Sequence, residues 1–146
     1  MKAPPRLTVL VVDDEPRSLE TLRRTLDDAF DVVTAENAEA AIERMETDAV
    51  QLVLSDQRMP GTSGVALLAQ IRQRWPDTVR MILSGHTDAQ DIIAGVNEAG
   101  IWQYLLKPWQ PEQLLLTLQR AAEVWRLQQE NQRLSLDLRT AEPVLK

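Results

Sequence analysis

Five short apolar runs recur along the chain with amphipathic stretches between them, and this alternation constrains the fold more than any other feature. Three of the runs, Leu-Thr-Val-Leu-Val-Val, Val-Gln-Leu-Val-Leu-Ser and Val-Arg-Met-Ile-Leu-Ser, are nearly continuous in apolar residues. Strands that are buried on both faces of a parallel sheet have this composition. We therefore expect strands at residues 7–12, 30–35, 51–55, 79–84 and 101–106.

The stretches between these runs place apolar residues three or four positions apart, which is the spacing of an amphipathic helix. Leu19, Leu22 and Leu26 mark the first helix. The residues that mark the next three are Ala38, Ala41, Ile42 and Met45, then Val65, Leu68 and Ile71, and then Ile92, Ile93 and Val96. Residues suited to helix starts are Pro16, Asn37, Ser63, Asp88 and Pro111, while Gly100 suits the end of the fourth helix.

Strands and helices that alternate in this way imply right-handed crossovers and an α/β fold. We expect a doubly wound, five-stranded parallel sheet with helices on both faces. In such a sheet, functional residues gather at the carboxyl ends of the strands, beside the point where the strand order reverses.

Polar residues stand at these expected strand ends. Asp13 and Asp14 follow the first strand, Asp56 follows the third, Ser84 ends the fourth and Lys107 follows the fifth. Each residue alone has an ordinary explanation, because an aspartate after a strand is usually a turn former or a cap. Their joint placement at one edge of the sheet predicts a site.

The side chains available at this edge restrict the chemistry of the site. The chain has no cysteine and one histidine, which argues against a disulfide and against a zinc or other soft-ligand site. Three carboxylates in one cleft repel each other, and Mg²⁺ prefers oxygen ligands of this kind. Mg²⁺ beside a carboxylate, a lysine and a hydroxyl is suited to phosphoryl transfer with the carboxylate as nucleophile.

The charge and the apolar runs also exclude some partners. A net charge of −6 argues against direct nucleic-acid binding by this segment. No apolar run approaches the roughly 20 residues that cross a bilayer. The first residues lack the apolar region of a signal peptide. We expect a cytoplasmic protein with no membrane association.

Four sequence blocks resemble the signature blocks of bacterial two-component response-regulator receiver domains. They are Val-Val-Asp-Asp-Glu at 11–15, Leu-Ser-Asp-Gln-Arg-Met-Pro-Gly at 54–61, Ile-Leu-Ser-Gly at 82–85 and Tyr-Leu-Leu-Lys-Pro at 104–108. All four occur in the order and spacing of that family. The resemblance covers residues 7–125 and implies the flavodoxin-like, CheY-like form of the α/β fold.

The resemblance assigns a metal site to the acidic residues. It implies that Asp56 is the phosphoacceptor and binds Mg²⁺ directly, together with Asp14 and the backbone carbonyl of Arg58. Asp13 is expected to act mainly through a coordinated water. Gly61 and Gly64 are expected to serve the turn after the acceptor and the start of the third helix.

The same resemblance assigns the remaining site residues. Lys107 is expected to pair with the phosphoryl oxygens, and the Lys107–Pro108 bond is expected to be cis. Ser84, where the family more often has threonine, would supply the hydroxyl that closes onto the phosphoryl group. Tyr104 would turn inward when it does.

Several residues depart from the family pattern or extend it. Gln57 follows the acceptor where many receivers carry an apolar residue. Arg58 and His86 lie two positions beyond the acceptor and the hydroxyl residue, where side chains in the family influence the lifetime of the phosphoryl group. Trp109 lies beside the site, and either local packing or contact with a partner explains it.

Asp-Gln-Arg-Met-Pro together with Lys-Pro-Trp resembles receivers of enhancer-binding transcription regulators, particularly the hydrogenase-uptake type. Similar blocks also occur in receivers that are joined to other output domains. The resemblance therefore favours transcription regulation as the output of a longer regulator.

The last helix is expected to be longer than a receiver needs, because no glycine or proline interrupts it from Pro111 to about residue 140. A heptad-like a/d pattern with one asparagine runs through Val124, Leu127, Asn131, Leu134, Leu138 and Ala141. We expect a homodimer through this helix. A monomeric linker helix is the alternative, because the pattern is short and Glu123, Glu130 and Asp137 have no obvious basic partners. The chain then divides into a tail at 1–6, a receiver at 7–125 and a linker helix at 126–146.

The sequence as a whole predicts a phosphorylation-dependent switch that a sensor histidine kinase loads at Asp56. It predicts no enzyme activity beyond self-phosphorylation and self-dephosphorylation. One alternative is a stand-alone or phosphate-independent receiver that acts as an interaction module. The other is an aspartyl phosphatase, which usually carries a second acid where this chain has Arg58.

Overall fold

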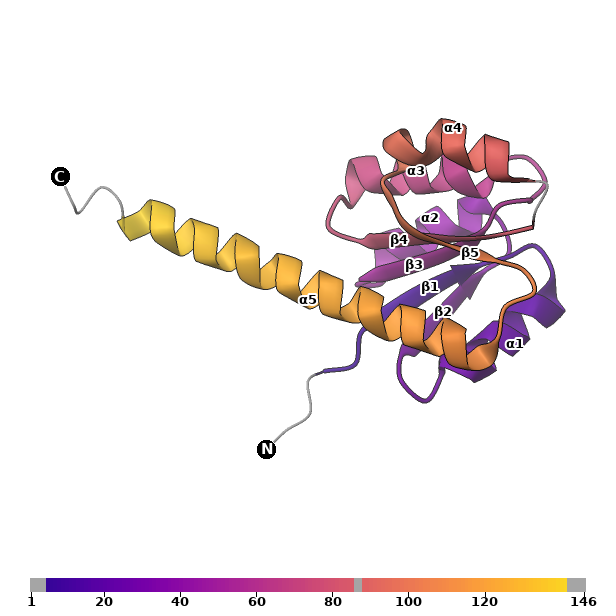
Figure 1. Cartoon of the computed structure of the whole chain (residues 1–146), viewed down its shortest axis with the longest axis horizontal. Helices are drawn as coiled ribbons and strands as arrows, with labels where there is room; N and C mark the ends of the chain where they lie inside the picture. Colours follow the sequence, from indigo (N-terminus) through magenta and orange to yellow (C-terminus); the bar gives the residue numbers. More distant parts are fainter. Residues whose placement is uncertain (1–4, 86–87, 142–146) are drawn as a thin grey trace.

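The computed structural model describes residues 5–85 and 88–141, without the side chains of residues 94 and 137–141. Strands and helices alternate along it as the apolar pattern predicts (Figure 1). The strands are β1 (Thr8–Val12), β2 (Asp31–Ala35), β3 (Leu52–Asp56), β4 (Val79–Ser84) and β5 (Ile101–Leu106). The helices are α1 (Pro16–Leu26), α2 (Ala38–Thr47), α3 (Gly64–Arg74), α4 (Ala89–Ala99) and α5 (Pro111–Ala141).

The five strands form one parallel sheet in the order β2-β1-β3-β4-β5, which confirms the predicted fold class. The order reverses at β1, so the carboxyl ends of β1 and β3 border the crevice where such sheets bind ligands. Strands β1, β2 and β3 each begin one residue later than predicted, and β3 also ends one residue later. Asp56 is the last residue of β3, because its pairing with Leu83 of β4 continues the ladder through it.

Helices cover both faces of the sheet and give the molecule two hydrophobic cores (Figure 1). Successive side chains of a strand point to opposite faces. In β1, Val9 and Val11 therefore pack with α1 and α5, while Leu10 and Val12 pack with α2, α3 and α4. This double burial explains why the sequence of β1 is apolar at consecutive positions.

Most predicted helix ends are confirmed. Pro16 occupies the first turn of α1, and the side chains of Asn37 and Ser63 accept hydrogen bonds from Ala40 N and Ala66 N. Gly100 ends α4 in the left-handed conformation, with φ 59° and ψ 47°. Asp88 occupies the N-cap position of α4, as predicted. Its carboxylate, however, makes no capping bond to that helix.

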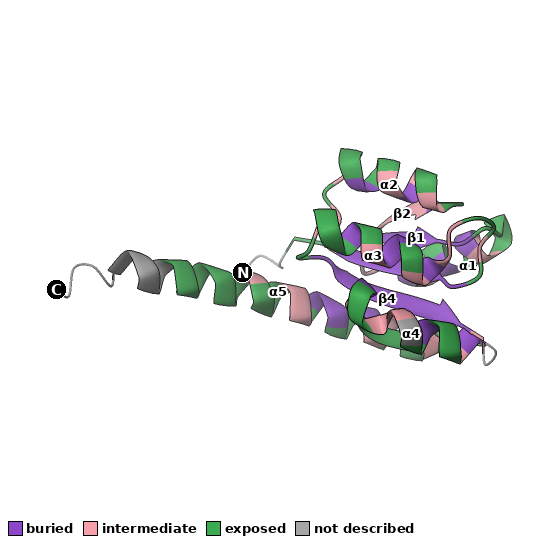
Figure 2. Ribbon diagram, turned by 90° about the horizontal axis from the view of Figure 1, so that it is seen from above, coloured by how far each residue is buried: buried purple, intermediate pink, exposed green. Residues whose placement is uncertain are grey.

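The last helix is long, as the uninterrupted sequence predicts. Figure 2 shows its buried residues where it crosses the sheet and exposed residues beyond. Gln132 Nε2 donates to Asp77 Oδ1 at 3.1 Å, which ties the far part of α5 to the turn between α3 and β4. Leu127 and Leu134 of the heptad-like pattern are exposed, whereas the side chains of Leu138 and Ala141 lie outside the described residues. No helix within residues 5–85 and 88–141 combines the length and apolar character needed to cross a membrane.

Candidate functional site

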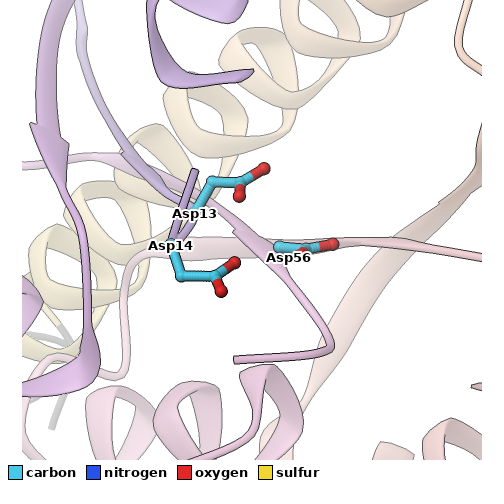
Figure 3. Close-up of side chains that lie close together, drawn as sticks. All are labelled: Asp13, Asp14 and Asp56. Carbon is cyan, nitrogen blue, oxygen red and sulfur yellow. The ribbon is translucent and has the colours of Figure 1, made fainter. Parts of the chain in front are cut away.

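The three acidic residues lie together at the carboxyl ends of β1 and β3. Asp13 and Asp14 directly follow β1, and Asp56 ends β3. Figure 3 shows their side chains close together. One carboxylate oxygen of each lies within 4.8 Å of those of the other two. The predicted juxtaposition of the acidic residues is therefore present in the structure.

Backbone hydrogen bonds beyond the strand ends hold this edge in place. Asp13 N donates to Ala35 O at 3.1 Å, and Gln57 N donates to Leu83 O at 3.0 Å. Lys107 N donates to Ser84 O at 2.8 Å. Because these bonds continue the parallel ladders, neighbouring strands share the positioning of the site residues.

Lys107 supplies the positive charge of the site. Its Nζ lies 2.5 Å from Asp56 Oδ1, and the Asp56 side chain is 7% exposed. The Lys107–Pro108 peptide bond is cis, as the resemblance implies. The structure therefore brings the predicted lysine onto the predicted acceptor.

Burial is the main influence on the titration of Asp13. It raises the pKa of this carboxyl from 3.8 to about 6, although a hydrogen bond from Glu15 N lowers it. The neighbouring charges of Asp56 and Asp14 raise the pKa further, whereas Lys107 lowers it. The site thus accumulates more negative charge than one lysine compensates.

The two predicted switch residues, Ser84 and Tyr104, differ in their surroundings. Ser84 is fully buried, and among the described residues its hydroxyl has no hydrogen-bond partner. Tyr104 lies on β5 and is 38% exposed. A buried hydroxyl without a partner beside the acidic cluster is available to an oxygen-rich group that arrives there.

These residues fall within a region that matches a known family. Residues 9–119 match the model of the response regulator receiver domain. The chain belongs to the response regulator receiver family.

Proteins similar to this receiver include transcription regulators. The chain is 54% identical to the hydrogenase transcriptional regulatory protein HoxA of Cupriavidus necator, over 95% of this chain and 29% of that protein. It is 33% identical to the DNA-binding transcriptional regulator NtrC of Escherichia coli, over 88% of this chain and 28% of that protein. The chain thus spans less than a third of these relatives.

Solved structures agree with the family assignment. A signal receiver domain of an HD domain-containing protein from Pseudomonas fluorescens superposes with a TM-score of 0.80 at 34% identity. The match covers 84% of this chain and 98% of that one. NtrX from Brucella abortus gives a TM-score of 0.82 at 28% identity, over 89% of this chain and 30% of that one.

The start of α3 packs directly against Asp56, the predicted acceptor. A Cβ on Gly64 would lie 2.2 Å from the carbonyl oxygen of Asp56, so only glycine permits this approach. Gly61, at φ +82°, turns the chain between them. Both glycines therefore serve the turn after Asp56 and the start of α3, as predicted.

Gln57 has a role that the sequence did not reveal. Its side-chain oxygen accepts from Val65 N at 2.9 Å, and its backbone oxygen accepts from Gly64 N at 2.9 Å. Together with the Ser63 cap, these bonds satisfy the free N–H groups of the first turn of α3. Gln57 thus holds the first turn of α3 next to Asp56.

Asp88 holds the predicted position before α4, but the partners of its carboxylate were not predicted. Its carboxylate turns back from α4 and accepts from Gly85 N at 3.0 Å and from Arg58 Nε at 2.5 Å. Arg58 is one of the two positions expected to influence the lifetime of a phosphoryl group, and the other, His86, lies outside the described residues. No local pattern predicts this pair, because its members are 30 positions apart.

Trp109 is partly buried and packs against the core beside α1 and α5. It also lines a groove with Arg17, Thr21 and Lys107, next to the acidic cluster. Local packing therefore accounts for the tryptophan, and contact with a partner stays a prediction.

The donor set fits a hard divalent cation. Three carboxylates offer oxygen ligands, and Asp14, the most exposed of them, leaves room for water. Mg²⁺ prefers one or two carboxylates plus several waters. The residues that could hold it are Asp13, Asp14 and Asp56, with the backbone carbonyl of Arg58 as the further predicted ligand.

Proposed function

We propose that this receiver is a phosphorylation switch in which Asp56 accepts a phosphoryl group from a phosphohistidine of a sensor kinase. One observation carries the proposal. Asp56 is a buried carboxylate that contacts Lys107 at 2.5 Å and shares its cleft with two further aspartates. Such a carboxylate can attack phosphorus while neighbouring charges neutralise the transferring group.

In the proposed reaction, a carboxylate oxygen of Asp56 forms a bond to phosphorus as the bond to the histidine nitrogen breaks. Asp14, Asp56 and the carbonyl of Arg58 would hold Mg²⁺, with Asp13 acting through a water. When bound, the ion supplies positive charge to the phosphoryl oxygens. Lys107 leaves its contact with the free carboxylate and pairs with the same oxygens.

The proposed response to phosphorylation begins at Ser84. The hydroxyl of Ser84, which has no partner among the described residues, donates to a phosphoryl oxygen. Tyr104 then turns inward from its exposed position on β5. This movement changes the surface formed by α4, β5 and α5, through which the switch acts on its partner.

The proposed output is transcription regulation in the cytoplasm. The similar proteins HoxA and NtrC are transcriptional regulators of which this receiver spans less than a third. By analogy, the receiver would control the rest of a longer regulator and would itself need no catalytic turnover.

Labelling with acetyl phosphate tests the acceptor. The native chain is expected to incorporate one phosphoryl group in the presence of Mg²⁺ and none after chelation. Asp56→Asn should abolish incorporation, because the amide cannot act as the nucleophile. Equal labelling of Asp56→Asn would contradict the assignment, and Glu46→Gln, far from the site on α2, serves as the control for folding.

We also propose that α5 mediates a homodimer. Leu127 and Leu134 are 59% and 47% exposed on the part of α5 that extends beyond the sheet, and the exposed Asn131 lies between them. A paired helix would bury these leucines, and an asparagine at such a position favours a defined register. Analytical ultracentrifugation of the native chain and of Leu127→Ser/Leu134→Ser tests this. A monomeric native chain would favour the linker-helix alternative.

A further inference from the structure

Helix α4 is held differently at its two ends. At its carboxyl end, two arginines bind the last carbonyl groups: Arg72 Nη1 bonds to Asn97 O, and Arg80 Nε donates to Ala99 O at 2.8 Å. Arg80 is buried and also donates to Thr78 O at 2.9 Å. These contacts anchor one end of the helix to α3 and to the interior of β4.

At its amino end, α4 is held through the carboxylate of Asp88. One carboxylate oxygen accepts from Arg58 Nε and the other from Gly85 N. The Asp88 side chain is 6% exposed, whereas that of Arg58 is 68% exposed. A buried carboxylate therefore pairs with a cation whose side chain is largely exposed.

The surroundings of Asp88 support this pairing. Burial by itself would raise the pKa of the Asp88 carboxyl, but the hydrogen bonds from Arg58 and Gly85 outweigh burial and hold the pKa below its usual value. Lys107 adds a further stabilising charge. Loss of Arg58 would leave a buried carboxylate with little compensation, which is costly.

The ion pair between Arg58 and Asp88, called the bridge below, joins the segment after Asp56 to the segment after Ser84. Gly85 directly follows Ser84, and Arg58 is two positions after Asp56. Asp14, Arg58 and Asp88 line the same cavity beside the acidic cluster. The carboxylate of Asp88 thus connects the loop after the acceptor to the loop after the hydroxyl.

We propose that Asp88 is a positioning residue that holds the Ser84–Gly85 segment and the amino end of α4 in the unphosphorylated arrangement through its bridge to Arg58. The inference rests on the proposed function and deepens it, because it names the contact that the phosphoryl group must overcome.

Charge competition explains how phosphorylation opens the bridge. A phosphoryl group on Asp56 brings about −1.5 to −2 charges. Its oxygens compete with Asp88 for the guanidinium of Arg58, which binds such oxygens in a favourable planar geometry. Asp88 then loses its counter-ion, and the Gly85 N–H is released as Ser84 moves toward the phosphoryl group.

The released carboxylate has a second place to bind. Asp88 is the residue that precedes α4, and at present its side chain caps no N–H group of that helix. An aspartate at this position normally accepts from the first turn and stabilises the helix. The amino end of α4 can therefore settle in a second arrangement while its carboxyl end stays anchored by Arg72 and Arg80.

Titration of the full chain with beryllofluoride and Mg²⁺, a stable mimic of the aspartyl phosphate, tests the inference. Asp88→Asn keeps the shape of the side chain but removes its charge, and it should strengthen beryllofluoride binding at least about fivefold. The amide resonance of Gly85 should already move toward its beryllofluoride-bound position before the mimic is added. A residue that only stabilises the fold would not produce that shift.

A double-mutant cycle assigns the effect to the bridge. In an Arg58→Gln background, Asp88→Asn should change binding less than about twofold, because the two side chains act through one contact. Arg58→Lys, which keeps the charge, should stay closer to the native chain than Arg58→Gln. The matched control is Arg74→Gln, which breaks the exposed Arg74–Glu46 pair at 2.7 Å and should leave binding unchanged.

The salt dependence of the Gly85 amide resonance tests the inference on the native chain. Salt weakens ion pairs that have an exposed member, so high salt should move the Gly85 amide resonance along the same path. Unchanged binding in Asp88→Asn, or an equal gain in the Arg58→Gln background, would overturn the inference. A native chain that does not bind beryllofluoride would overturn the proposed function itself.

Discussion

Strands β3 and β5 both end at the functional edge, yet they differ in how far the fold covers them. Every residue of β3 is buried, from Leu52 to Asp56. In β5, Trp102, Tyr104 and Leu106 are between 37% and 41% exposed. The central strand thus carries the proposed acceptor, while the edge strand carries the proposed responding residue.

This contrast follows from the strand order. β3 pairs with a strand on each side and is covered on both faces, whereas β5 pairs only with β4. The register of that pairing also shifts between Arg80 and Met81, which marks an irregularity in the edge. A reactive group needs rigid surroundings, which β3 gives to the proposed acceptor. A residue that changes position needs space, which β5 gives to Tyr104.

The largest expected effect is on stability, at matched leucines of the two strands. Leu54→Ala in β3 removes a fully buried side chain and should lower the free energy of unfolding by about 3 kcal/mol. Leu106→Ala in β5 removes a side chain that is 41% exposed and should cost less than about 1 kcal/mol. Urea unfolding of both variants measures the difference, and equal losses would break the contrast between centre and edge.

A smaller effect on the free energy of unfolding is expected from the charge of Asp13, which follows β1, an interior strand of the sheet. The pKa of Asp13 is raised to about 6 from 3.8, so the folded metal-free chain binds this proton more tightly than the unfolded chain does. Its contribution to stability is therefore complete below about pH 4 and is lost as the pH rises through about 6. Asp13→Asn should stabilise the metal-free protein at pH 7 by on the order of 1–2 kcal/mol.

Thermal unfolding between pH 4 and pH 8, with and without Mg²⁺, checks this prediction. The stability advantage of Asp13→Asn should shrink toward pH 4, where the native carboxyl is protonated. It should also shrink when Mg²⁺ is added, because the ion compensates the native charges. An advantage that is independent of both pH and Mg²⁺ would show that charge is not its cause.

The smallest effect on the free energy of unfolding is expected at Tyr104 on the edge strand β5. Tyr104 is 38% exposed, so Tyr104→Phe should change the free energy of unfolding by less than about 0.5 kcal/mol. Urea unfolding of the unphosphorylated protein measures it. A larger loss would mean that the hydroxyl is already engaged, which would contradict an unswitched position for Tyr104.

Much of the candidate site could be predicted because its residues stand at strand ends. Asp13, Asp14, Ser84 and Lys107 each occupy a position that the apolar pattern locates to within one residue. Asp56 is the last residue of β3, whereas the apolar pattern ends the strand one residue earlier. The pattern misses it because an acidic residue rarely ends a buried strand unless a neighbouring strand continues the ladder. The resemblance to the family blocks then added an expected role for each residue, which spacing alone does not reveal.

Other contacts could not be predicted from the sequence. Gln57 looks like a polar interruption after the acceptor, but its side chain binds the first turn of α3. Asp88 looks like a cap for α4, but its carboxylate binds Arg58 instead. Each side chain could bind a neighbour in sequence or a group that is distant in sequence. Only the folded structure brings the distant group within hydrogen-bond distance.

The sequence by itself determined the alternation of strands and helices, the helix ends at Pro16, Asn37, Ser63 and Gly100, and the set of residues at the functional edge. These features depend on hydrophobic periodicity and on neighbours a few positions away, which a linear pattern contains. Only the tertiary structure decided that β3 is enclosed and β5 exposed, and that Asp88 joins the acceptor loop to α4. Those outcomes depend on strand order and on groups brought together across 30 positions of chain.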